Sequence, residues 1–198
     1  LDDGKTPLFT TDTLRETRKT LHPLTINYIR ETRRNEIGVK RNRLVKFAKH
    51  KICIMMDDDD VYFPTYIKHS VETLKRSKSG LVGSNHMLFI YPNHNYNMSK
   101  IECSAKRQIH EATMCFTKKY FNSMNGFKRN SQGEGVGLID FNDKNVENIP
   151  IDNLMICVAH KGQTLSKDPF YEYSEHVQPY MDRSILKKHY DLIDSLDI

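Results

Sequence analysis

Four consecutive aspartates, Asp57 to Asp60, are the residues of this sequence best suited to chemistry. Adjacent carboxylates repel one another, so ionising all of them costs free energy unless a cation compensates. They directly follow the apolar run Ile52–Met56, which predicts a central parallel strand buried on both faces. In an open α/β sheet, ligands bind at the carboxyl ends of such strands. The pattern therefore predicts a Mg²⁺ or Mn²⁺ site completed by substrate phosphates. An exposed acidic loop is the alternative, and the glycine and glutamate spacing of an EF-hand is missing.

A second chemical feature is the basic segment from Arg30 to Lys51. It contains nine lysines and arginines but only two acidic residues, Glu31 and Glu36. Such a segment attracts anions, which would be the phosphates of a nucleotide, a nucleic acid or an acidic membrane surface. A solvated helix face with a few useful charges has the same composition, so charge alone does not choose between these readings.

The elements that must position these residues alternate between short apolar strands and amphipathic helices. This alternation indicates an α/β fold of three layers around a mostly parallel central sheet. The predicted strands are 23–29, 52–56, 81–82, 87–91, 112–116 and 154–159, and the predicted helices are 37–50, 64–76 and 184–196. A turn is expected at 92–95, and the glycine-rich stretch 130–137 is expected to be a mobile loop.

Length and composition indicate one domain over residues 1–198, with an ordinary hydrophobic share of 38% and a formal net charge of +5. No run approaches the roughly 18 apolar residues of a membrane span, and no secretory signal opens the chain. The four cysteines have no close CxxC spacing, which argues against a zinc or disulfide framework and favours a reducing cytoplasm. The opening Leu1-Asp2-Asp3-Gly4 reads as the end of a strand that begins before Leu1.

Three motifs occur in order: Asp2-Asp3-Gly4, then Gly38-x-Lys40-Arg41-Asn42, then the apolar run into Asp57–Asp60 with Pro64 shortly after. Together they resemble the nucleotide-sugar glycosyltransferases of the A-type fold, most closely the inverting family 2. The resemblance covers residues 1–66 well and the remainder loosely. It departs from the family at Lys5, where serine or threonine is usual, and in the first strand, which is not in this sequence. The short form also resembles glycosyltransferases of large DNA viruses (chlorovirus-like), which would place the protein in the host cytoplasm.

The resemblance assigns roles to residues of each motif. In the family, the first acidic pair contacts the base and ribose, the basic pair faces the nucleotide, and an Asp-x-Asp pair meets the ribose and the metal. A histidine after a later strand often adds a metal ligand, although a lone histidine at a strand end is more often structural. Carried over, the nucleotide-binding residues are Asp2, Asp3, Lys40, Arg41, Asp57 and Asp58, and the metal ligands are Asp59 and His160.

The resemblance also points to the catalytic base. The family usually supplies it from a Glu-Asp pair in a late loop, where this sequence has Gly133-Glu134-Gly135. Glu134 is therefore the expected base, with Asp140 in reserve, and a solvated loop glutamate is the alternative. Arg41 is expected to serve the nucleotide, so its loss should leave the melting temperature nearly unchanged.

The function implied by the resemblance is metal-dependent sugar transfer. The donor would be a nucleoside diphosphate sugar, UDP-glucose or similar, and the acceptor a hydroxyl of a glycan or glycoprotein. Inversion at the anomeric carbon is expected, and retention stays open because the Glu-Asp pair is incomplete. This reading requires neither nucleic acid nor an integral membrane segment. Two alternatives stay open at this point: a sugar nucleotidyltransferase, and a non-enzymatic basic protein that binds nucleic acid through the 30–51 segment.

Overall fold

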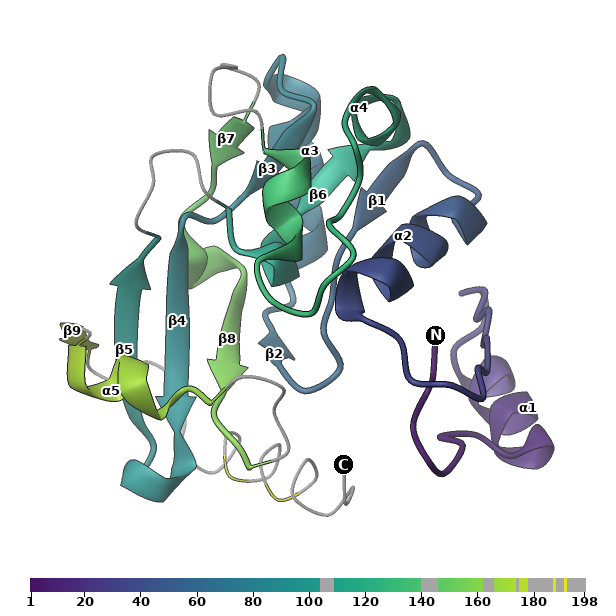
Figure 1. Ribbon diagram of the computed structural model, residues 1–198, viewed down its shortest axis with the longest axis horizontal. Coiled ribbons are helices and arrows are strands. Elements are labelled where there is room, and N and C mark those ends of the chain that lie inside the picture. Colours follow the sequence, from purple (N-terminus) through teal and green to yellow (C-terminus); the bar gives the residue numbers. More distant parts are fainter. Residues whose placement is uncertain are drawn as a thin grey trace.

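The computed structural model describes residues 1–103, 109–139, 146–161, 166–173 and 175–177, together with Lys187 and Asp191. Its strands form two sheets that follow one another along the molecule (Figure 1). The predicted helix 184–196 and the reserve residue Asp140 lie outside the described residues, apart from Lys187 and Asp191.

The first sheet has the strand order β1-β6-β3-β7. Its strands are β1 (Ile52–Ile54), β6 (Cys115–Thr117), β3 (Leu81–Gly83) and β7 (Val146–Asn148). β6 runs antiparallel to both β1 and β3, while β3 and β7 are parallel. β1 and β3 run in the same direction, so the segments that precede these two strands lie at the same end of the sheet.

The second sheet has the order β2-β8-β4-β5-β9. Its strands are β2 (Val61–Tyr62), β8 (Met155–Val158), β4 (His86–Tyr91), β5 (Asn97–Glu102) and β9 (Glu175–Val177). β4 is parallel to β8 and antiparallel to β5, to which it is joined through a 3-10 turn, η1 (Pro92–His94). The predicted turn at 92–95 is thereby confirmed.

The α/β class is confirmed, but strand direction differs from the prediction. Two of the seven strand pairs among the described residues are parallel and five are antiparallel. The run Ile52–Met56 predicts a central parallel strand, whereas β1 is an edge strand of the first sheet and pairs antiparallel with β6. A continuous apolar run reports burial on two faces, and burial does not encode the direction of the neighbouring strand.

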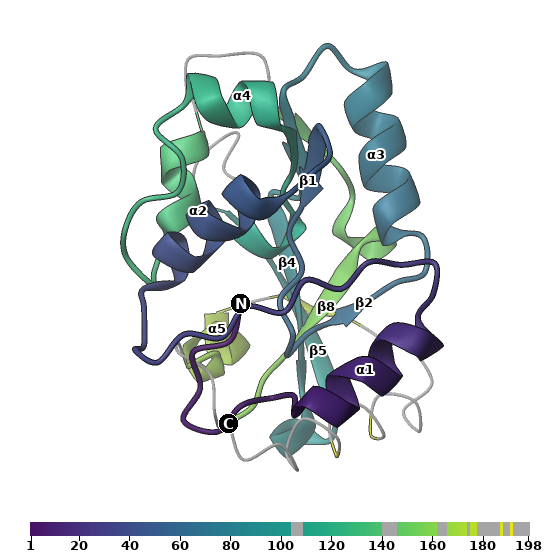
Figure 2. The same cartoon turned by 90° about the vertical axis from the view of Figure 1, so that its right-hand side faces the viewer.

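The helices cover the first sheet on both sides (Figure 2). The helices of the described residues are α1 (Thr11–Thr20), α2 (Ile37–Phe47), α3 (Tyr66–Arg76), α4 (Lys118–Ser123) and α5 (Asp168–Tyr173), with 3-10 turns η2 (Glu111–Thr113), η3 (Glu134–Leu138) and η4 (Ile151–Asn153). α2 and α4 lie on one side of the strands and α3 on the other, which gives the three predicted layers. The predictions of α2 and α3 are confirmed within a few residues of their ends. None of the described helices is long and apolar enough to cross a membrane.

The N-terminal arm, residues 1–35, lies beside the main body rather than inside it (Figure 1). Its helix α1 contains no buried residue. The predicted strand 23–29 does not form; one isolated bridge joins Asp2 to Arg30 instead. The apolar alternation of the segment matches a strand, but Leu24 stays 68% exposed, so no sheet covers that face.

Two apolar clusters fill the interior. One surrounds β4 and β8 and includes Phe89, Ile90 and Val158. The other lies between α2 and the first sheet and includes Val45, Phe116, Phe127 and Leu138. The four cysteines are all buried and unpaired, as their spacing predicts. The second cluster fixes α2 against the segment that leads to η3.

The contact between α2 and that segment leaves no room for a side chain at Gly38. A Cβ atom built there would lie 1.8 Å from the Lys128 carbonyl oxygen, and the Gly38 N–H already donates to Asn130 O at 2.9 Å. The stretch predicted as a mobile loop is therefore packed closely on α2, and it ends in η3, where Glu134 and Leu138 are buried.

We expect Gly38→Ala to lower the free energy of unfolding by about 1–3 kcal/mol, the usual cost of overpacking a tight contact. Thermal and denaturant unfolding would measure it. Gly133→Asn is the control, because Gly133 has φ 64° and nothing within 4 Å of a Cβ, and asparagine tolerates that left-handed backbone. If both variants unfold alike, the helix–loop contact is not tight.

Candidate functional site

The four aspartates form the turn between β1 and β2, and we call Asp57–Asp60 the aspartate turn. Two phenols fix the backbone at its start. Tyr62 Oη accepts from the Asp57 N–H at 2.8 Å and donates to Ala112 O at 3.1 Å. Tyr66 Oη donates to Met55 O at 2.5 Å. The backbone that carries the Asp57 carboxylate is therefore held by a hydrogen bond on each side of Met56.

Arg41 of α2 lies under the aspartate turn and is buried. Its Nη2 contacts both carboxylate oxygens of Asp57, at 2.9 and 3.0 Å. On its other side, Nε lies 3.0 Å from Glu134 Oε1, although its N–H is not aimed along that line. Burial acts to lower the pKa of Arg41, but the charges of Asp57 and Glu134 raise it by more, so the guanidinium stays charged. One cation thus joins two of the predicted functional carboxylates.

Glu134 is only 4% exposed, which rules out the alternative of a solvated loop glutamate. Burial raises the pKa of its carboxyl group, and Arg41 opposes this rise while Glu111 and Asp57 add to it. Its backbone is fixed too, since Glu134 O accepts from the Lys128 N–H at 2.8 Å. A buried carboxylate with a raised pKa is a stronger base than an exposed one.

The other half of the aspartate turn meets the end of β8. Asp59 Oδ2 lies 3.1 Å from His160 Nε2, so two residues assigned to the metal come together. Asp60 Oδ1 accepts from the Val158 N–H at 3.2 Å. Burial, followed by the charges of Asp59 and Asp57, raises the pKa of Asp60 well above its usual value. The turn is thus a concentration of negative charge with a histidine at its edge.

The donor set fits a hard divalent cation that a substrate would help to hold. Among the described residues, no three acidic, histidine or cysteine side chains converge tightly enough to form a complete metal site. Mg²⁺ and Mn²⁺ bind through one or two protein ligands and substrate phosphates. Asp59 and His160 supply such a partial set: the Asp59 side chain is 30% exposed and follows the exposed Asp58, whereas the His160 side chain is buried.

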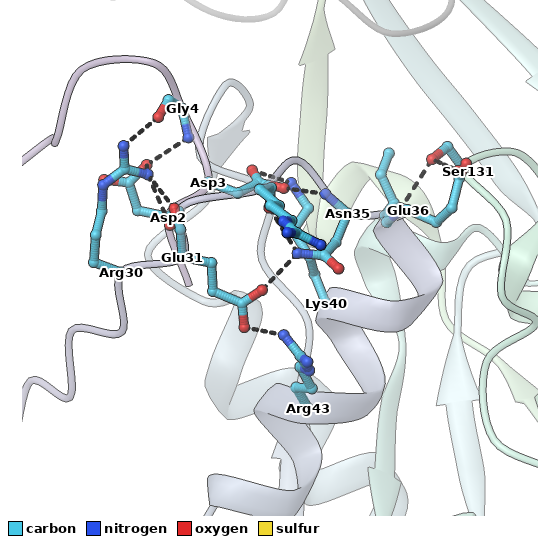
Figure 3. A network of polar contacts seen from close by, with 12 residues as sticks. Asp2, Asp3, Gly4, Arg30, Glu31, Asn35, Glu36, Lys40, Arg43 and Ser131 are labelled. Carbon is cyan, nitrogen blue, oxygen red and sulfur yellow. Dashed lines mark hydrogen bonds and ion pairs between the residues drawn. The ribbon is translucent and has the colours of Figure 1, made fainter.

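The first acidic pair lies within a polar network that ties the N-terminal arm to α2 (Figure 3). Asp2 accepts hydrogen bonds from the Tyr28 hydroxyl and from the N–H groups of Gly4 and Leu8, both at 2.9 Å. Arg30 Nη1 lies 3.5 Å from the same carboxylate. Burial acts to raise the pKa of Asp2, but these hydrogen bonds and Arg30 lower it to about 2. Asp2 is therefore ionised, and its hydrogen bonds and its ion pair hold the N-terminal arm together.

Asp3 makes the connection to α2. Its Oδ1 lies 2.9 Å from Lys40 Nζ, and its Oδ2 accepts from the Asn35 N–H at 2.8 Å. Glu31 extends the network by accepting from the Asn35 side chain at 2.5 Å and pairing with Arg43 (Figure 3). The carboxylates assigned to the base and ribose thus form internal ion pairs, and Lys40 is one of their partners.

Three consecutive residues of α2 serve three separate segments. Lys40 binds Asp3, and Arg41 binds the aspartate turn and Glu134. Asn42 pairs with the backbone of Phe127, accepting from its N–H at 2.9 Å and donating to its carbonyl at 2.8 Å. The second motif is therefore the part of the chain that assembles the other two with the loop of Glu134.

Sequence reasoning missed several residues of this site. Tyr62 carries no motif, and its role depends on how β2 turns back toward Asp57. Lys167 places its ammonium 5.9 Å from the centre of the Phe89 ring, and its charge lowers the pKa of Asp60. Glu111 accepts from the Gly135 N–H at 3.2 Å, beside Glu134. A lone lysine or glutamate in an unassigned segment gives no signal that it will face the aspartate turn.

Comparison with known proteins identifies the family of the chain. The model of the family described as "Glycosyl transferase family 2" matches residues 1–140, which include every predicted site residue except His160. The chain belongs to glycosyl transferase family 2. No curated protein matches the sequence.

Solved structures show the fold of this family 2 chain. A mannosyltransferase from Pyrobaculum calidifontis, solved with GDP-Man and Mn²⁺, is similar with a TM-score of 0.55 and 15% identity over 76% of this chain and 44% of its own. TarS residues 1–349 from S. aureus is similar with a TM-score of 0.54 and 13% identity over 82% of this chain and 50% of its own. The chain thus spans about half of each neighbour. The A-type fold is confirmed, and neither of these two neighbours is viral, so the viral resemblance gains no support.

Burial of Arg41 changes one expectation drawn from the sequence. Arg41→Ala would leave Asp57 and Glu134 facing each other without their cation, and removing one partner of a buried ion pair typically costs about 3–5 kcal/mol. We therefore expect a clear fall in melting temperature rather than an unchanged one. Arg43→Ala is the control, because Arg43 is exposed and its pair with Glu31 should contribute about 0–1 kcal/mol. Equal melting temperatures for the two variants would contradict the structural role of Arg41.

Proposed function

We propose that this family 2 chain transfers a sugar from a nucleoside diphosphate sugar to an acceptor hydroxyl, in a reaction that requires a divalent cation. The observation that carries the proposal is the Arg41 bridge between Asp57 and Glu134. It brings the motif expected at the donor and the residue expected to be the base to one place, although 77 positions separate them in the sequence (134 minus 57).

The donor would lie along the line from the N-terminal arm to the aspartate turn. Asp2 and Asp3 shape the end that receives the base and ribose, and Lys40 beside Asp3 supplies a positive charge. Asp57 and Asp58 would meet the ribose and the phosphates. We propose a uridine nucleotide as the donor, on the family resemblance; the mannosyltransferase that shares the fold was solved with GDP-Man.

Asp59 and His160 would hold Mn²⁺ or Mg²⁺ together with the diphosphate. The cation, when bound, neutralises the charge that develops on the departing diphosphate. The protein contributes Arg41 and Lys167, which add positive potential around the aspartate turn. The protein would supply only part of the metal's ligands, and the diphosphate of the substrate would supply the rest.

Glu134 would remove the proton from the acceptor hydroxyl as that oxygen attacks the anomeric carbon. One displacement at that carbon, with the nucleoside diphosphate leaving from the opposite side, inverts its configuration. Burial favours a higher pKa for Glu134, while Arg41 keeps the carboxylate available in its ionised form. The acceptor would be a hydroxyl of a glycan or glycoprotein.

Metal dependence tests the donor site. Because the aspartate turn and the diphosphate are both anionic, we expect UDP to bind much more tightly with Mn²⁺ than in EDTA, measured by calorimetry. Asp59→Asn should remove most of that difference, whereas Asp58→Asn, at an exposed position, should remove less. Equal affinity with and without metal would overturn the metal role. GDP measured in parallel distinguishes a failure of the uridine assignment.

Glu134→Gln tests the base. The change keeps the shape of the side chain and removes its basicity, so transfer should fall by about 10²–10⁴-fold, with nucleotide affinity nearly intact. Glu111→Gln is the matched control at the neighbouring carboxylate. The readout is sugar transfer to an acceptor in a donor-saturated assay. Transfer by the Glu134 variant within a few-fold of the parent, or a larger loss in the Glu111 variant, would move the role of base away from Glu134.

A further inference from the structure

Three segments that are far apart in the sequence meet at the end of the first sheet opposite the aspartate turn. β1 and β3 both begin there, and the antiparallel strand β6 ends there. The Lys118 N–H donates to Lys51 O at 2.8 Å, and the Thr117 N–H donates to Gly80 O at 3.1 Å. Figures 1 and 2 both place α4, the start of β1 and the connection from α3 to β3 at this end.

These three segments are strongly basic. Residues 46–51, 75–80 and 117–119 contain no aspartate or glutamate. Their exposed lysines and arginines are Lys46, Lys49, Lys51, Lys75, Arg76, Lys78 and Lys119, which we call the basic end. None of these seven forms an ion pair with a residue in the part of the chain that the structure describes, whereas Arg30, Lys40, Arg41 and Arg43 of the sequence's basic segment are all paired.

Helix stability accounts for only part of this charge. Lys46 and Lys75 lie in the last turns of α2 and α3, where a cation interacts favourably with the helix dipole. Lys119 lies in the first turn of α4, where a positive charge is unfavourable. Lys49, Lys51 and Lys78 lie outside any helix. Gathering like charges at one end costs electrostatic free energy, so an anionic partner is the simplest reason for it.

Two apolar side chains stand exposed among the lysines. Phe47 is 57% exposed and Leu44 38% exposed, both on the last turn of α2 beside Lys46. Neither contributes to the clusters that hold α2 to the body, which use Val45 instead. Their exposure is therefore unexplained by the packing of the chain.

We propose that the basic end docks this protein on an anionic lipid membrane, with Phe47 and Leu44 entering the headgroup region. Reversible membrane association generally combines a polybasic surface with a second, apolar contribution, and both are present here. Six of the seven residues of the basic end are lysines, which are compact point charges without the planar fork by which arginine favours nucleic acid. The exposed apolar pair also favours a lipid surface, because the headgroup region accepts such side chains. Because the aspartate turn lies at the other end of β1, docking would leave the donor site open.

Vesicle sedimentation tests the proposal without any nucleotide, so its outcome is independent of the proposed function. We expect the protein to sediment with vesicles of equal parts phosphatidylcholine and phosphatidylserine, and not with phosphatidylcholine alone. Lys46→Glu combined with Lys49→Glu should weaken binding about tenfold or more. Phe47→Ser should weaken it several-fold without any change in charge.

The control has the same change in net charge elsewhere: Lys19→Glu combined with Lys68→Glu, on exposed positions of α1 and α3. It should bind vesicles nearly as well as the parent. Equal losses in both double variants would mean that net charge alone is responsible, and an unchanged Phe47→Ser variant would remove the apolar contribution; either result overturns the proposal. So does tight binding of a DNA duplex through Lys46 and Lys49 by a protein that ignores the vesicles. Circular dichroism confirms that each variant is folded.

Discussion

The structure depends on one buried cation. A guanidinium removed from water is costly unless its charge and its donors are matched, and removing either partner exposes that cost. The charge of Arg41 is matched by Asp57 and Glu134, although its Nε–H has no hydrogen-bond partner among the described residues. The consequence is geometric: the turn after β1 and the start of η3 cannot move independently, because each supplies one of the charges that keep Arg41 in place.

The N-terminal arm is held in a different way. α1 buries no residue, so apolar packing contributes little to the position of the arm. Instead, Asp2 and Asp3 hold it through hydrogen bonds and ion pairs, and both carboxyl groups have lowered pKa values. The sign follows from these shifts: the two aspartates stabilise the folded arm above their unfolded pKa near 3.8 and lose that contribution as the pH falls below it. Because its attachment is polar, the arm depends on pH and on ionic strength more than the apolar clusters of the body do.

The sequence predicts the family and the elements with strong hydrophobic periodicity. It does not predict the features that depend on which segments pair with one another. The apolar stripe of α3 and the short apolar runs at β3, β4 and β8 encode burial, which hydrophobic patterns report well. The direction of β1 and the absence of a strand at 23–29 depend on neighbours that those patterns do not specify. The site shows the same division. The resemblance assigned Asp59 and His160 to one metal, and the structure brings the two side chains together. The burial of Arg41 and Glu134 and the contact of Tyr62 with Asp57 arise only once distant segments are folded together.

The order Lys40-Arg41-Asn42 has a consequence for how such a chain could vary. Successive residues of a helix point about 100° apart, and here each of the three directions is taken by a different segment: the arm, the aspartate turn and the backbone of Phe127. Inserting or deleting one residue earlier in α2 would rotate all three side chains onto the wrong neighbours at once. The helix is therefore tolerant of exchanges on its exposed face, such as at Arg43, but intolerant of any change in its length before Lys40. Variation in this region should accumulate as substitutions and in the arm that precedes the helix, with the register of α2 held constant.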